Sequence, residues 1–128
     1  MKLLVTGGTG FLGRALIPRL RAHGHGLVLL TRKPRPSPGL SDSGPASGSA
    51  AARPPPAAVG WDSGWERDLA SFDGIINLAG ESIAGGRWTA ARKQALRDSR
   101  IGTTRRLVQA LAAASPPRPS VLVNASAI

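Results

Sequence analysis

The sequence has 128 residues, enough for one domain with a buried core, and its 17 Lys and Arg against 7 Asp and Glu give a formal net charge of +10 at pH 7. It contains no cysteine, which excludes disulfides and thiolate metal sites, and no metal is expected. It has no apolar run of about 18 residues and its first strand pattern begins at Lys2, so we expect neither a membrane span nor a leader peptide but a soluble intracellular protein, in the cytoplasm.

The first stretch joins a short apolar run, a glycine-rich turn and the start of a helical pattern. Its glycines have the spacing Gly7-x-x-Gly10-x-x-Gly13. Strand, Gly-rich turn and helix in this order are typical of dinucleotide binding. We expect Gly7 to adopt a conformation that a Cβ disfavours, Gly10 to leave room for a diphosphate, and Gly13 to let the helix approach the strands. The N–H groups of the first helical turn would face the phosphates. The alternative is an ordinary tight turn with spare glycines.

The helix that starts in this turn is predicted to continue to His23. Gly24 is expected to end it, because glycine tolerates the left-handed conformation that often follows a helix. Pro18 lies inside the pattern and removes one backbone hydrogen bond, so the helix is expected to kink there.

A buried parallel strand is predicted at Leu27–Leu30 and ends in Thr31-Arg32-Lys33, with no acidic residue nearby. An NAD site places a carboxylate at about this distance from the glycines, whereas an NADP site uses an arginine near the 2′-phosphate. Arg32, with the Thr31 hydroxyl beside it, therefore favours NADP. The alternative is two basic residues at an ordinary strand end.

The composition changes at residues 34–58, which are rich in Pro, Gly, Ser and Ala and are predicted to form a flexible surface insertion in a single domain, 1–128. A short third strand is predicted at Val59–Asp62 and a brief helix at Trp65–Phe72. A fourth strand, Ile75–Gly80, ends in small residues that would let a cofactor approach.

A long helix is predicted from Thr89 to Ala114, followed by a fifth strand at Val121–Asn124. Strands that alternate with helical segments predict an α/β fold of the Rossmann type, a doubly wound parallel sheet in the order 3-2-1-4-5 that is truncated after strand five. The fifth strand would lie at the sheet edge, so self-association through it is a hypothesis.

Several further segments carry a more specific pattern than the glycines alone. They are Thr6 to Gly13, Asn77-Leu78-Ala79-Gly80-Glu81, Arg87-Trp88-Thr89 and Ser99-Arg100-Ile101. The chain resembles, outside residues 34–58, the atypical extended short-chain dehydrogenase/reductases called epimerase family proteins (family 39U). Trp88 is expected to pack in the core or to cap the site.

The resemblance implies an NADP-binding Rossmann domain. With the glycine turn, it places cofactor contacts at Gly7, Thr9, Gly10, Phe11, Leu12, Gly13, Thr31, Arg32, Leu78, Ala79, Gly80 and Arg100. On the residues alone, Arg100 would be a solvated or salt-bridged side chain of the long helix. Only the resemblance assigns it to the cofactor.

Enzymes of the resembled superfamily use a Tyr-x-x-x-Lys pair beyond the fifth strand, where the tyrosine is the general acid or base. This sequence contains no tyrosine and ends where that segment would begin. Ser126 is a candidate for polarising a substrate oxygen, or else a small residue needed for packing.

The resemblance thus implies the NADP-binding part of an oxidoreductase or nucleotide-sugar-epimerase-like protein, catalytically incomplete, with an unidentified small-molecule substrate. The alternatives are a non-catalytic NADPH-binding regulatory module and, from the net charge, a basic nucleic-acid-binding protein.

Overall fold

The computed structural model describes residues 1–34, 55–84 and 86–125. Its elements are β1 (Lys2–Thr6), α1 (Phe11–Ala22), β2 (Gly26–Thr31), β3 (Ala57–Gly60), the 3₁₀ helix η1 (Trp65–Ser71), β4 (Gly74–Asn77), α2 (Ala90–Ala113) and β5 (Val121–Asn124). The strands form one sheet in the order β3-β2-β1-β4-β5, and all neighbouring pairs are parallel. The predicted α/β fold and strand order are therefore confirmed.

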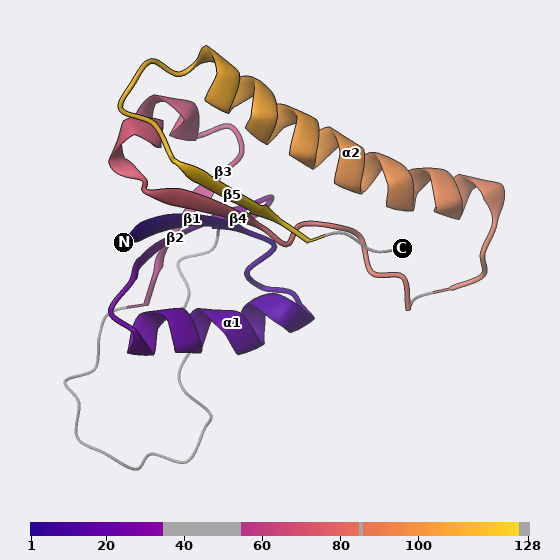
Figure 1. Cartoon of the computed structure of the whole chain (residues 1–128). Coiled ribbons are helices and arrows are strands. Elements are labelled where there is room, and N and C mark those ends of the chain that lie inside the picture. The colour runs from indigo at the N-terminus through magenta and orange to yellow at the C-terminus, as the bar shows by residue number, and fades with distance from the viewer. Residues whose placement is uncertain (35–54, 85, 126–128) are drawn as a thin grey trace, which may run out of the picture.

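Two layers of helix cover the sheet, α1 on one face and α2 with η1 on the other (Figure 1). Each face has its own apolar cluster, because successive side chains of a strand point to opposite sides. Leu3, Val5 and Leu29 pack with Ile17 of α1. Leu4 and Leu30 pack on the other face with Leu107 of α2. Strands buried on both faces explain the continuous apolar runs in the sequence.

The third strand lies earlier than the sequence pattern predicts. Ala57, Ala58 and Val59 pair with β2, whereas Trp61 and Asp62 have already left the strand in a turn. Pairing with β2 decides this boundary, since the Ser63 amide and hydroxyl both donate to the Gly60 carbonyl and turn the chain away. The predicted insertion at 34–58 is therefore wrong at its carboxyl end, because Ala57 and Ala58 belong to β3. Residues 35–54 of this predicted insertion lie outside the described residues.

Other boundaries differ in length. β4 ends at Asn77 rather than Gly80, because its partner β1 ends at Thr6 and the Leu78 amide makes the last bond of that ladder, to the Thr6 carbonyl. The segment at 65–71 is a 3₁₀ helix. Gly24 follows the end of α1 with φ +84°, as predicted, and α1 continues through Pro18.

β5 is at the edge of the sheet, as predicted. Leu122 faces the α2 side, where it packs on the core, whereas Val121 and Val123 are 47% and 51% exposed. Pairing of two copies through this strand stays a prediction. It is tested by measuring the molecular mass in solution at several protein concentrations, because self-association raises that mass as the concentration rises. Within the described ranges, no helix is both long and apolar enough to cross a membrane.

Candidate functional site

A cleft of about 480 Å³ opens at the carboxyl ends of the strands, between the β1–α1 turn and the chain that follows β4. Three predicted residues of the turn line it: Gly7, Thr9 and Gly10. So do Thr31 and Arg32 after β2, and Leu78, Ala79 and Gly80 after β4. Residues from three parts of the sequence therefore meet where open parallel sheets bind ligands.

Gly7 is required by two features of the turn. Its φ is +69°, in the left-handed region, and an added Cβ would lie 2.5 Å from the carbonyl carbon and oxygen of Leu78. The conformational role predicted for Gly7 is therefore confirmed. Gly10 differs, since among the residues that the structure describes an added Cβ would meet only the Gly7 carbonyl oxygen, at 3.2 Å. Its bare backbone forms open surface of the cleft.

Gly13 brings α1 against the turn, not against the strands as predicted. An added Cβ would lie 2.3 Å from the Gly8 carbonyl oxygen, a contact that real Cβ atoms do not make. Gly8, absent from the predicted site, is itself covered: its added Cβ would lie 2.8 Å from Ile17 Cδ1 and 3.0 Å from Leu29. The prediction failed because a glycine spacing does not say which backbone lies opposite.

The amino end of α1 has the features of an anion site. Gly10 is its N-cap and supplies no side-chain hydrogen bond, so the N–H groups of the first turn are left for another acceptor. Phe11 and Leu12 are 90% and 57% exposed and do not line the cleft, nor does the buried Gly13. The cleft therefore reaches α1 at its N-cap, Gly10, and not at these three residues.

One end of the cleft is formed by residues 31–33 and by Trp61. The site prediction did not include Trp61. Trp61 lies in the turn after β3, where Arg106 Nη2 donates to its carbonyl at 2.5 Å and to Glu66 Oε1 at 3.1 Å. Its ring meets that of buried Trp65 edge to face, with centroids 5.7 Å apart. No spacing rule indicates this position, because α2 fixes it from 45 residues away.

A buried polar network supports the wall opposite the turn. Thr6 Oγ1 donates to Asn77 Oδ1 at 2.5 Å, and the Ala79 amide donates to both oxygens at 3.3 Å. The side-chain amide of Asn77 (Nδ2) donates to Thr104 Oγ1 on α2 at 3.2 Å and to Asn124 Oδ1 on β5 at 2.6 Å. Asn77 and Thr6 are 2% and 0% exposed, so this network ties the backbone at Ala79 to three strands and a helix.

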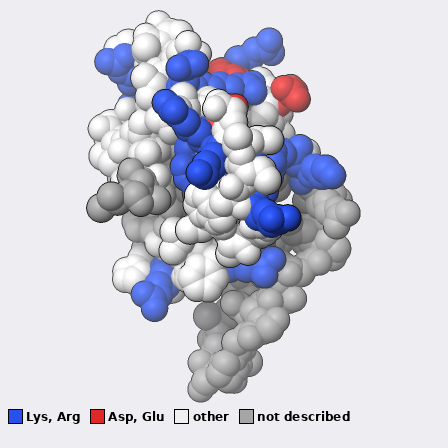
Figure 2. All heavy atoms as spheres, turned by 90° about the vertical axis from the view of Figure 1, so that its right-hand side faces the viewer, with Lys and Arg blue, Asp and Glu red and all other residues white. Residues whose placement is uncertain are grey.

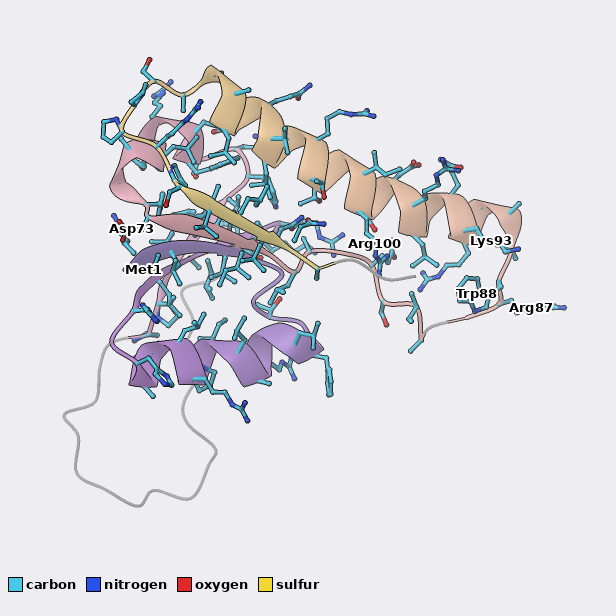
Figure 3. All side chains as sticks on the ribbon, in the orientation of Figure 1. Met1, Asp73, Arg87, Trp88, Lys93 and Arg100 are labelled. Atoms are coloured by element: carbon cyan, nitrogen blue, oxygen red, sulfur yellow. The ribbon has the colours of Figure 1, made fainter. Side chains whose placement is uncertain are left out.

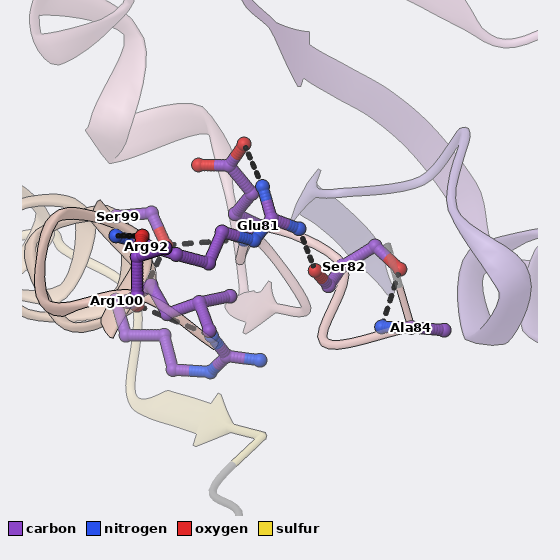
Figure 4. Close-up of polar contacts among 8 residues, drawn as sticks. Glu81, Ser82, Ala84, Arg92, Ser99 and Arg100 are labelled. Atoms are coloured by element: carbon purple, nitrogen blue, oxygen red, sulfur yellow. Dashed lines mark hydrogen bonds and ion pairs between the residues drawn. The ribbon is translucent and has the colours of Figure 1, made fainter. Parts of the chain in front are cut away.

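The other end of the cleft contains Glu81, Ser99 and Thr103, which the sequence did not indicate. The Glu81 amide donates to Ser99 Oγ at 3.1 Å, and its carboxylate accepts from Arg92 at 3.3 Å. Figure 4 shows Arg92 between Glu81 and the loop carbonyl of Ser82. Helical spacing could have placed Ser99 and Thr103 on one face of α2, but not against Glu81.

Arg100 lies beside the cleft and does not line it. Its guanidinium carbon would lie 3.2 Å from a Cβ added to Gly80, and its Nη1 donates to the Leu96 carbonyl at 3.2 Å. In Figure 3, Arg100 lies near the carboxyl ends of the strands, whereas Arg87 and Trp88 lie beyond the amino end of α2. Trp88 is 61% exposed, so the expectation that it packs in the core is wrong. Ser126 lies outside the described residues.

Basic side chains are widespread on the face at the carboxyl ends of the strands, with few acidic ones among them (Figure 2). Arg32 and Lys33 place two positive charges at the cleft itself. A field of this sign raises the local concentration of anionic ligands.

Comparison with known proteins agrees with this geometry. The profile of the NAD dependent epimerase/dehydratase family matches residues 3–127. The chain is 37% identical over 127 residues to epimerase family protein SDR39U1 of Bos taurus, and 38% identical over 128 residues to epimerase family protein YfhF of Bacillus subtilis. The crystal structure of human epimerase family protein SDR39U1 (isoform 2) with NADPH superposes with a TM-score of 0.70 at 31% identity.

These similarities extend along almost the whole chain but along only part of the relatives. The matches include 97% and 100% of this chain but 36% of the Bos taurus and 38% of the Bacillus subtilis protein. The human structure is matched over 100% of this chain and 37% of its own.

Proposed function

The chain belongs to the NAD dependent epimerase/dehydratase family, and we propose that it is the NADP-binding part of an oxidoreductase or nucleotide-sugar-epimerase-like protein. The observation that carries the proposal is a cleft lined both by Gly10, the N-cap of α1, which has no side chain, and by the basic residue Arg32.

The residues present fit a dinucleotide. Gly7 and Gly10 form a backbone cradle that side chains would fill, and the first-turn amides of α1 supply N–H donors to a diphosphate. When bound, NADP supplies hydride transfer to or from a carbon next to oxygen. The chain's own residues bind and orient: the turn would hold the diphosphate, and Leu78, Ala79 and Gly80 would form the facing wall.

Arg32 would choose between the two nicotinamide cofactors. It is exposed, lies at the cleft and follows β2, where an acidic residue would instead accept the ribose hydroxyls. A guanidinium forms charge-assisted, bidentate bonds with a phosphate. Thr31 adds a hydroxyl at the same end of the cleft, so the 2′-phosphate of NADP would be recognised there.

The sequence contains no tyrosine, the residue that serves as acid or base in the resembled enzymes, so the activity proposed for this chain is cofactor binding. A non-catalytic NADPH-binding module has the same cleft and the same binding chemistry. Because the matched family is one of NAD-dependent enzymes, nucleic-acid binding is not favoured.

Titration of the chain with NADPH and NADH tests the proposal. Trp61 lines the cleft, so its fluorescence should be quenched by bound NADPH. We expect Arg32→Gln to lower the affinity for NADPH about tenfold, because one charge-assisted phosphate contact is lost, and to leave the affinity for NADH unchanged.

Arg105→Gln is the matched control, since it removes the same charge from an exposed position on α2 outside the cleft lining. It should change neither affinity. Failure of the unsubstituted chain to bind NADPH, or equal losses of NADPH affinity in both variants, would contradict the proposal.

A further inference from the structure

The loop after β4 forms part of the cleft yet belongs to neither a strand nor a helix. Gly80 and Glu81 line the cleft, and Ser82 to Ala84 continue the loop away from it. The hydroxyl of Ser82 accepts from the Ala84 amide at 3.3 Å, which closes a local turn. A loop wall of this kind keeps a fixed shape only if something outside the loop holds it.

Three contacts from α2 hold this loop. Arg92 Nη1 donates to Glu81 Oε1 at 3.3 Å, and its Nη2 donates to the Ser82 carbonyl at 2.6 Å. Two turns further along α2, Ser99 Oγ accepts from the Glu81 amide at 3.1 Å while donating to the Leu96 carbonyl at 2.9 Å. One guanidinium thus holds two successive loop residues, and Ser99 anchors the first of them a second time (Figure 4).

The position of these contacts in the cleft indicates which half of a bound dinucleotide they lie beside. Because the strand order is β3-β2-β1-β4, the glycine turn after β1 is in the middle of the cleft, with Arg32 and Trp61 after β2 and β3 at one end. With the diphosphate at the turn and the adenosine phosphate at Arg32, the nicotinamide half must extend to the other end. Glu81, Ser99 and Thr103 line that end.

We infer that Arg92 is a positioning residue for the nicotinamide half of the cofactor, acting through Glu81 and the Ser82 carbonyl on the shape of the cleft. The inference rests on the proposed function and goes beyond it, since Arg92 does not itself line the cleft. The Arg92 and Glu81 side chains are 25% and 40% exposed, so the ion pair alone is weak. The charged hydrogen bond to the Ser82 carbonyl gives the contact its directionality.

Two ligands separate the halves of the cleft experimentally: NADPH, and adenosine 2′,5′-bisphosphate, which lacks the nicotinamide half. We expect Arg92→Gln to weaken NADPH binding roughly fivefold, because a loosened wall must be ordered when the nicotinamide half binds. Binding of the bisphosphate should be unchanged. A merely structural role would weaken both ligands alike.

Lys93→Gln is the matched control, because Lys93 is the next residue of the same helix and is exposed outside the cleft lining. It should change neither affinity. Ser99→Ala removes the acceptor of the Glu81 amide without changing charge, and it should reproduce the selective loss of NADPH affinity should Arg92→Gln fail to fold.

The outcomes distinguish the inference from the proposed function. If the unsubstituted chain binds neither ligand, the proposed function fails and the inference fails with it. If it binds both, and Arg92→Gln weakens both equally or neither, cofactor binding stands and the role of Arg92 is overturned. Where Arg92→Gln does not fold, the same result from Ser99→Ala overturns the holding of the loop by α2.

Discussion

The two long helices are attached to the sheet by different means. α1 packs on the sheet through Ile17, and its amino end rests on backbone, since Gly13 lies against Gly8. α2 is held by side chains, through buried Leu107 and through polar contacts that Thr104, Arg92 and Arg106 make with strands and loops. The cleft lies between these two attachments, so one wall is set by backbone contacts and the other by hydrogen bonds.

The difference predicts how each side responds to change. Backbone atoms in van der Waals contact cannot yield without moving the turn, so a single added methyl group on the α1 side should have a large effect. Hydrogen bonds on the α2 side are several and partly exposed, so losses there should be graded. The following substitutions test the contrast.

Gly13→Ala should have the largest effect. The added Cβ would lie 2.3 Å from the Gly8 carbonyl oxygen, so α1 or the turn must shift, and we expect a loss of about 3 kcal/mol in the free energy of unfolding. Urea denaturation followed by circular dichroism measures it, as a lower midpoint with an unchanged slope.

Gly102→Ala is the control on α2. No atom of the described residues lies within 4 Å of its added Cβ, and alanine is the better helix former, so the variant should gain roughly 0.5–1 kcal/mol. Equal effects of the two substitutions would mean that helix propensity, and not contact with the turn, decides the result at position 13.

Asn77→Leu should have the second largest effect. Asn77 is 2% exposed and bonds to Thr6, Thr104, Asn124 and the Ala79 amide, so leucine removes these hydrogen bonds and leaves the buried Thr6 hydroxyl without its acceptor, at a cost of about 2 kcal/mol. The same urea experiment measures it. Asn124→Ala, which removes one exposed partner, should cost less; a larger loss from Asn124→Ala would show that Asn77 does not organise the network.

Arg106→Gln should have the smallest effect. The Arg106 and Glu66 side chains are 43% and 36% exposed, so their ion pair is worth at most about 1 kcal/mol even with the bond to the Trp61 carbonyl. We expect a small fall in the urea midpoint and a change in Trp61 fluorescence. Arg105→Gln should change neither, and an equal shift in both variants would rule out a specific role for the contact at Trp61.

The site residues that could be predicted are those that their neighbours in the sequence make recognisable. The glycine turn, Arg32 after β2 and the small residues after β4 are each recognised from a few neighbouring residues, and the cleft is lined by Gly7 to Gly10 of the turn, by Arg32 and by Leu78 to Gly80. Trp61 was missed because its place depends on where β3 ends, which pairing with β2 decides. Glu81 and Ser99 were missed as site residues because, although both lie in segments that carry the resemblance, nothing local shows that they contact each other at the cleft.

By itself, the sequence determined the order of strands and helices, the strand–turn–helix at the amino end and membership of the family, because apolar periodicity, glycine spacing and motif residues act over short distances along the chain. The tertiary structure alone decided that Gly13 packs on Gly8, that Thr6 and Asn77 bond across 71 residues, and that Arg92 holds the loop at Glu81. These contacts depend on how strands pair and helices pack, which bring together residues that no short stretch of sequence relates.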